Sequence, residues 1–243
     1  MRKVCDITLT ISPKRVTQVL TFVVLCLALA SVAGQYSKHV LGHDKLFGLV
    51  RLFDLDDEGN IPTWFASASL LFCSVLLAII GRDRRWGGDR YYLHWSTLSG
   101  IFLLLSIDEA AHIHESLNTR VRAILKTEGL LQNAWIIPGA AFALIVAVAC
   151  RHFLADLPGG TRRLFLAAGS LYVGGALGVE ALGGWYTALY GQQNMTYALM
   201  ATIEELLEML GIVVLIYALL SYMSSHLKEI RVRVGDGAPR SQV

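Results

Sequence analysis

Two apolar stretches of the sequence carry acidic and histidine side chains of the kind that bind metal ions or transfer protons. One stretch runs from Leu93 to Leu117 and the other from Ala198 to Met223, and a further acid lies in a third apolar stretch. An ionisable group at the centre of a membrane-spanning helix costs roughly 2.5–3.5 kcal/mol, so each such residue indicates a functional site. The candidate ligands are Asp108, Glu109, His112, Glu115, Glu180, Glu204, Glu205 and Glu208.

A metal ion would account for this combination of side chains. Many carboxyl groups at short range cannot all be ionised, so either several are protonated or a cation neutralises them. An imidazole beside carboxylates favours a redox or divalent metal such as Fe, Mn or Zn over Ca or Mg. We therefore expect a metal site, in which Ser106, Tyr186 and Thr202 could hold the ligands in place.

Helical spacing sorts the residues of the first stretch by face, because positions three or four apart are neighbours on a helix. On one continuous helix, Glu109 and His112 share a face. Asp108 and Glu115 also share a face with that histidine. His114 is expected to point elsewhere, toward the membrane interface.

The last stretch offers a second set of ligands. Glu205 and Glu208 share one face, and Glu204 shares an adjoining face with Glu208. The Glu109-x-x-His112 spacing resembles that of ferritin-like di-metal carboxylate bundles, where Glu and Glu-x-x-His groups from several helices surround two metal ions. The likeness covers four residues and concerns ligand chemistry. The sequence lacks a second Glu-x-x-His, so Glu205-x-x-Glu208 would replace it.

The elements that would position these residues are membrane-spanning helices. The chain of 243 residues is 54% hydrophobic and 16% charged, whereas soluble domains carry about 25% charged residues. We predict an all-α polytopic integral membrane bundle of about six helices, with residues 1–223 as one domain and 224–243 as a polar cytoplasmic tail. Segments 36–53 and 116–132 are predicted to be amphipathic and to lie along the outer interface. The spans are predicted near 16–34, 61–81, 93–115, 134–154, 163–188 and 199–223.

The positions of the acids along these spans place them in one layer. At about 1.5 Å per residue, Asp108, Glu180 and Glu205 all lie about 22–29 Å from the inner ends of their helices. Gly174-x-x-x-Gly178 is the small-residue spacing that lets membrane helices approach closely, which would bring Glu180 toward its partners.

The basic residues predict the orientation of the bundle. Six crossings put both termini on one side, and most lysines and arginines flank the spans on that side. The positive-inside rule therefore places both termini in the cytoplasm and the acids near the outer face. The first span also resembles a signal peptide, and its cleavage would leave five spans with the same orientation.

Two alternative interpretations concern the acids. Thr202-x-x-Glu205 matches a capping box, which would make Glu204 and Glu205 ordinary acids of a first helical turn. The segment Asp54-x-Asp56-x-Glu58-Gly59 resembles the opening of a calcium loop, but Phe65 takes the place of its last ligand. An acidic turn that ends at an Asn60 helix cap is the favoured interpretation of that segment.

The sequence leaves three functions open. The first is a membrane-embedded metalloprotein, which could be an enzyme that acts on a lipid-like substrate near the outer leaflet. The second is a proton- or cation-coupled transporter, although the inner halves of the spans are almost purely apolar. The third is a non-catalytic subunit of a larger membrane complex. The net charge of +2, with no basic run interleaved with aromatics, argues against nucleic-acid binding.

Overall fold

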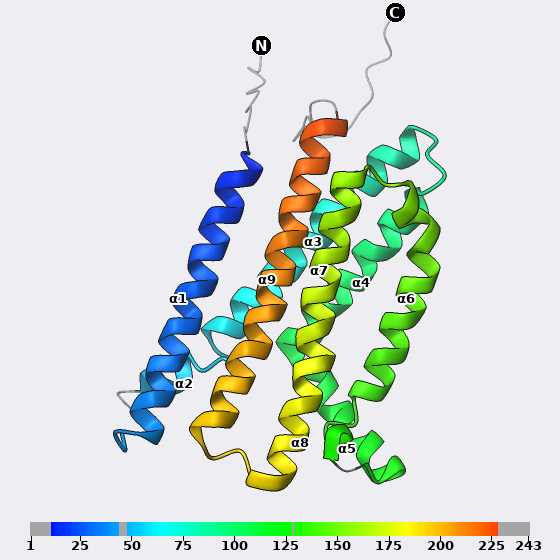
Figure 1. The fold of residues 1–243 in the computed structure, drawn as a ribbon. Coiled ribbons are helices and arrows are strands. Elements are labelled where there is room, and N and C mark those ends of the chain that lie inside the picture. The colour runs from blue at the N-terminus through cyan, green and yellow to red at the C-terminus, as the bar shows by residue number, and fades with distance from the viewer. Residues whose placement is uncertain (1–10, 44–47, 128, 228–243) are drawn as a thin grey trace, which may run out of the picture.

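The protein is an all-helical bundle (Figure 1). The computed structural model describes residues 11–43, 48–127 and 129–227, and this part of the chain contains no strand. The predicted fold class is confirmed in this respect. The elements in chain order are α1 (Pro13–His39), α2 (Leu49–Leu52), α3 (Ile61–Trp86), α4 (Tyr92–Ala111), α5 (Ile113–Leu125), η2 (Gly129–Leu131), α6 (Ile136–Asp156), α7 (Gly159–Val173), η3 (Gly174–Val179), α8 (Glu180–Tyr190) and α9 (Met195–His226).

Five segments of the described chain are long and apolar enough to cross a membrane. They are α1, α3, α6, the continuous segment Gly159–Tyr190 and α9. The expected sixth span, α4, has 20 residues but is not among them. Polar residues in its first turns and the acids near its end make it less apolar than the others. A crossing by α4 therefore stays a prediction.

The element boundaries differ from the predicted ones at both ends of the chain. The predicted outer segment 36–53 divides into the end of α1, which continues to His39, and the four-residue helix α2, and residues 44–47 lie outside the described residues. The tail was predicted from residue 224, but α9 continues to His226. Residues 228–243 lie outside the described residues.

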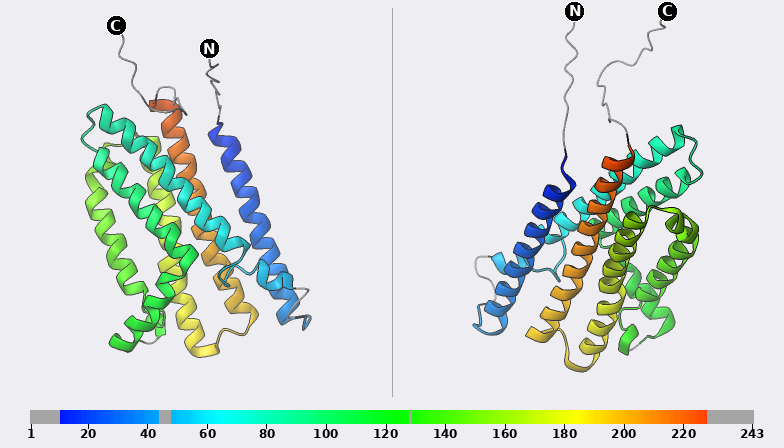
Figure 2. Two further views of the ribbon diagram at one scale, coloured as in Figure 1. Left: turned by 180° about the vertical axis from the view of Figure 1, so that it is seen from behind. Right: turned by 45° about the horizontal axis from the view of Figure 1, so that its top comes forward.

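The long helices lie side by side, and α9 packs against α1, α3, α7 and η3 (Figures 1 and 2). The start of α1 and the end of α9 lie at one end of the bundle, and α5 and the turn between α8 and α9 lie at the other. We call this second end the acidic end, because Asp108, Glu180 and Glu205 lie toward it.

Serine pairs join α3 to α4. Ser74 and Ser99 each donate to the other's backbone carbonyl, at 2.8 and 2.9 Å. Ser67 and Ser106 do the same nearer the acidic end, also at 2.8 and 2.9 Å. Small hydroxyl side chains allow helices to approach closely and satisfy their own polar groups in an apolar environment. Ser106 is therefore engaged in helix packing and does not orient a ligand.

Helix α6 is attached mainly at its two ends. At the end away from the acids, Phe153 is buried with its ring centroid 4.9 Å from that of Trp95, and Tyr91 donates to Asp156 at 2.7 Å. At the acidic end, Trp135 lies just before the helix and donates to Glu180 at 3.1 Å. Between these attachments the helix is mostly exposed, so it stands apart from α4.

Asparagine side chains begin two of the helices. Asn60 accepts from the backbone N–H of Thr63 at the start of α3, as the sequence predicted. Asn194 accepts from Tyr197 at the start of α9, so this helix begins well before Thr202. The alternative capping box at Thr202 is wrong, because its hydroxyl donates to Ala198 within the helix.

Close packing of η3 on α9 depends on a different glycine from the predicted pair. A Cβ atom at Gly174 or Gly178 would meet nothing within 4 Å. A Cβ atom at Gly175 would lie 2.7 Å from the carbonyl oxygen of Glu204 and 3.0 Å from Cγ of Glu208. The predicted close approach is present, but the GxxxG pair does not make it, because the π-helical turn of η3 changes which residues face α9.

Replacing Gly175 by Ala is expected to lower the free energy of unfolding by about 1–3 kcal/mol, because the added methyl group would overlap the backbone of α9. The midpoint of thermal unfolding in detergent measures this loss. Gly178→Ala is the matched control and should not lower the midpoint, since its methyl group would enter open space. Equal losses of stability in the two variants would contradict the assignment of the close contact with α9 to Gly175.

Candidate functional site

The predicted helix 93–115 is interrupted at His112. This residue adopts a left-handed conformation with φ of 55°, which ends α4 at Ala111 and starts α5 in a new direction. Such a conformation is unfavourable for a residue with a Cβ atom and persists where surrounding contacts impose it. The predictions that His112 shares a helix face with Glu109, Asp108 or Glu115 are therefore wrong.

Asp108 and His114 hold the two sides of this break together. The carboxylate of Asp108 accepts from the backbone N–H of His114 at 2.9 Å and lies 3.1 Å from its ring Nδ1. The prediction that His114 points toward the interface is wrong, because the break turns its ring back toward α4. Burial alone would lower the pKa of His114, but Asp108 and the nearby carboxylates of Glu58 and Glu109 outweigh it and raise the pKa to about 9.

A third side chain, Glu58, joins this pair from the loop before α3. Its carboxylate contacts Nδ1 of His112 and lies 3.7 Å from Nε2 of His114. Burial raises the pKa of Glu58, although the hydrogen bond with His112 opposes this effect. The sequence placed Glu58 in an acidic turn and missed its role here. The density of acids in that turn was the only available signal.

The remaining acids come from α8 and α9. Glu180 begins α8, accepts from the indole of Trp135 and lies close to Glu204. Tyr172 of α7 lies close to Glu208. The close packing at Gly175 brings these two helices together, so Glu180 approaches its predicted partners.

Both groups of acids line one cavity of about 1160 Å³. Every predicted ligand except His112 lines it. Asp56 and Glu58 join them from the loop before α3. No lysine or arginine is among the described residues of its wall. This arrangement gives the cavity a strongly acidic end.

The rest of the cavity is an apolar shaft. Its wall combines residues of α4, α6, α7 and α9, and it extends from the acidic end as far as Leu98, Leu154 and Phe165. The shaft occupies the space beside the detached middle of α6. The apolar residues that line it include Leu98, Ile101, Phe102, Leu105, Phe142, Val146, Leu154, Phe165, Leu166, Val173, Ile212 and Leu215.

The expected metal site stays a prediction. Among the described residues, no three His, Cys, Asp or Glu side chains converge in a geometry that could hold a metal ion. The residues expected to orient the ligands have other partners. Tyr186 donates to Asn194, Ser106 pairs with Ser67, and the hydroxyl of Thr202 is bonded within α9.

A family match covers this whole arrangement. The chain belongs to the family described as domain of unknown function DUF8692. The match spans residues 18–223, from α1 to the last turns of α9, and so includes every wall of the cavity. No curated protein and no solved structure matches the chain.

The His114–Asp108 pair predicts a dependence of stability on pH in chelator-treated protein. The pKa of His114 is raised from 6.5 to about 9, so the charged pair stabilises the fold fully below pH 6.5. This contribution, on the order of 2 kcal/mol, should be lost as the pH rises through about 9. Thermal unfolding in detergent between pH 6 and pH 10 measures it.

His114→Gln provides the comparison for this measurement. The variant should be less stable than the wild type at pH 6, and the difference should shrink toward pH 10. A stability difference between the two proteins that stays constant from pH 6 to pH 10 would show that the charge of the His114–Asp108 pair does not stabilise the fold.

Proposed function

We propose that this chain is an integral membrane protein that binds a lipid-like molecule in its cavity and acts on the polar group of that molecule. The observation that carries the proposal is the continuity of the apolar shaft with the acidic end. A molecule with a hydrocarbon chain and a polar head would match both parts at once. Its chain would lie in the shaft and its head beside Asp108, Glu180 and Glu205.

The dimensions of the cavity support a large ligand. Pockets for small molecules measure about 300–1,000 Å³, and this cavity of about 1160 Å³ is at least as large. Helix α6 is attached at its ends through Phe153 and Trp135. A lipid could therefore enter sideways past its less tightly packed middle.

The acidic end has groups suited to proton transfer. His114 is oriented by Asp108, which is the arrangement that general acid–base catalysis uses to hold an imidazole in place. Glu109, Glu205 and Glu208 line the same space and could accept or donate a proton there. An enzyme acting on the head group is the function that these groups support best.

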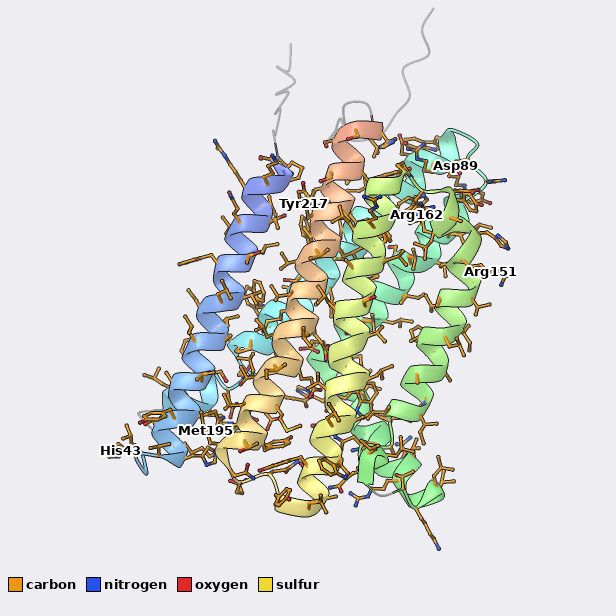
Figure 3. The ribbon with its side chains drawn as sticks, in the orientation of Figure 1. His43, Asp89, Arg151, Arg162, Met195 and Tyr217 are labelled. Carbon is orange, nitrogen blue, oxygen red and sulfur yellow. The ribbon has the colours of Figure 1, made fainter. Side chains whose placement is uncertain are left out.

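The distribution of charge supports the proposed orientation. Arg151 and Arg162 lie toward the opposite end of the bundle from Met195 (Figure 3). By the positive-inside rule, the end with the arginines would face the cytoplasm and the acidic end the outer side. The site would then be near the outer leaflet, with α4 as a sixth crossing.

The two alternatives fit this cavity less well. A proton- or cation-coupled transporter needs polar groups that continue across the membrane, whereas the shaft beyond the acids is lined by side chains such as Leu98, Phe102 and Leu215. A structural subunit would need no cavity that joins an apolar space to the acids. Either alternative would gain support if no lipid-like molecule occupied the shaft.

Filling the shaft tests the proposal. Ala147 of α6 lines the cavity, so Ala147→Trp should reduce the lipid that remains bound after purification several-fold. Mass spectrometry of extracted lipid per mole of protein measures this. Ala149→Trp is the matched control, because Ala149 is exposed on the same helix and is not part of the cavity wall. Equal lipid contents in the two variants would refute the proposal.

Metal binding is the second candidate, favoured by the approach of both His112 and His114 to the carboxylate of Glu58. Closure of these groups around Fe, Mn or Zn would supply a Lewis acid beside the head group. Elemental analysis of wild-type protein should then find near-stoichiometric metal, and His112→Ala should lose it. Metal that is absent from the wild type, or unchanged in the variant, would exclude this site.

A further inference from the structure

The acidic end of the cavity selects among head groups by charge. Carboxyl groups reach it from the loop before α3 and from α4, α8 and α9, including Asp56, Asp108, Glu180 and Glu205. Within the described residues, the wall has no lysine or arginine, and its one cationic group, His114, is paired with Asp108. A phosphate or carboxylate head would be repelled by these groups, whereas a cation would be attracted.

Glu205 presents a carboxyl group to the cavity. Its side chain is half-buried. None of the side-chain hydrogen bonds within the described residues involves it. A ligand that donates hydrogen bonds into the cavity would therefore find an open acceptor here.

The aromatic residues of the acidic end add to this preference. Trp135 and Tyr197 both line the cavity there. Each is already fixed by a carboxylate, Trp135 by Glu180 at 3.1 Å and Tyr197 by Asp56 at 3.1 Å. Indole and phenol rings attract cations to their faces, and ammonium groups are commonly recognised in this way.

We propose that the ligand is a long-chain amine, a lipid whose head is a primary ammonium group without a phosphate. The ammonium group carries one positive charge and three donors, which the acceptors around Glu205 would take up. Its hydrocarbon chain lies in the apolar shaft. This inference rests on the proposed function, because it names the head group of the lipid-like molecule assigned to the cavity.

Three probes with the same sixteen-carbon chain test the head-group preference of the wild type. Hexadecylamine, hexadecanol and palmitate are titrated in turn into protein in neutral detergent, after chelation of metals, and the bound fraction is measured by native mass spectrometry. The amine is expected to bind at least about ten-fold more tightly than the other two. Equal binding of the amine and the alcohol, or preference for palmitate, overturns the inference.

Two variants locate the preference within the cavity. Glu205→Gln replaces the carboxyl group by an amide that cannot become charged, and it should reduce amine binding several-fold while leaving hexadecanol binding unchanged. Asp83→Asn, which changes a carboxylate near the opposite end of α3, is the matched control and should bind the amine as the wild type does. If Glu205→Gln does not fold, the comparison of the three probes on the wild type still tests the preference for an amine head group.

The same titrations distinguish a failure of the amine inference from a failure of the proposed binding of a lipid-like molecule. Ala147→Trp should abolish binding of all three probes if the shaft holds the chain. If the three probes bind the wild type equally well but do not bind this variant, the cavity is supported as the binding site and the preference for an amine head group is overturned. Binding of no probe to the wild type would overturn both. Binding of palmitate only after Zn²⁺ or Mn²⁺ is added would overturn the amine in favour of a metal site.

Discussion

The attachment of α6 by its two ends is the constraint on which the cavity depends. Phe153 packs on Trp95 at one end, and the indole of Trp135 is bonded to Glu180 at the other. Because both anchors are strong contacts of aromatic side chains, the middle of the helix does not need to pack against α4. A helix packed along its whole length would fill the shaft and leave the acids without an apolar neighbour.

The acidic end depends in turn on contacts that bring distant segments together. Gly175 allows η3 to touch the backbone of Glu204, which brings α8 and α9 close enough for their acids to meet. The left-handed turn at His112 directs His114 back to Asp108, and Glu58 reaches both histidines from the loop before α3. Each group of acids is therefore built across a break or an irregular turn of a helix.

Much of the fold could be predicted from the sequence, because apolar length and helical rise are local properties. They predicted five of the long helices and the gathering of Asp108, Glu180 and Glu205 at one end. They could not predict the left-handed turn at His112, where the ring contacts Glu58, a residue more than fifty positions away. The same limit explains why His114 was misplaced and why Gly175 was overlooked. Side-chain partners between helices, unlike helix positions, leave no periodic signal.

The serine pairs between α3 and α4 have a consequence for how the site is aligned. Ser67 and Ser74 are seven residues apart, as are Ser99 and Ser106, so both pairs match at only one register of the two helices. Sliding α4 by one turn along α3 would break both reciprocal pairs together. Glu58 precedes α3 and His112 follows α4, so their meeting requires this register. The serine hydroxyl groups thus fix the register of α3 against α4. This register determines where the loop before α3 and the end of α4 come into contact.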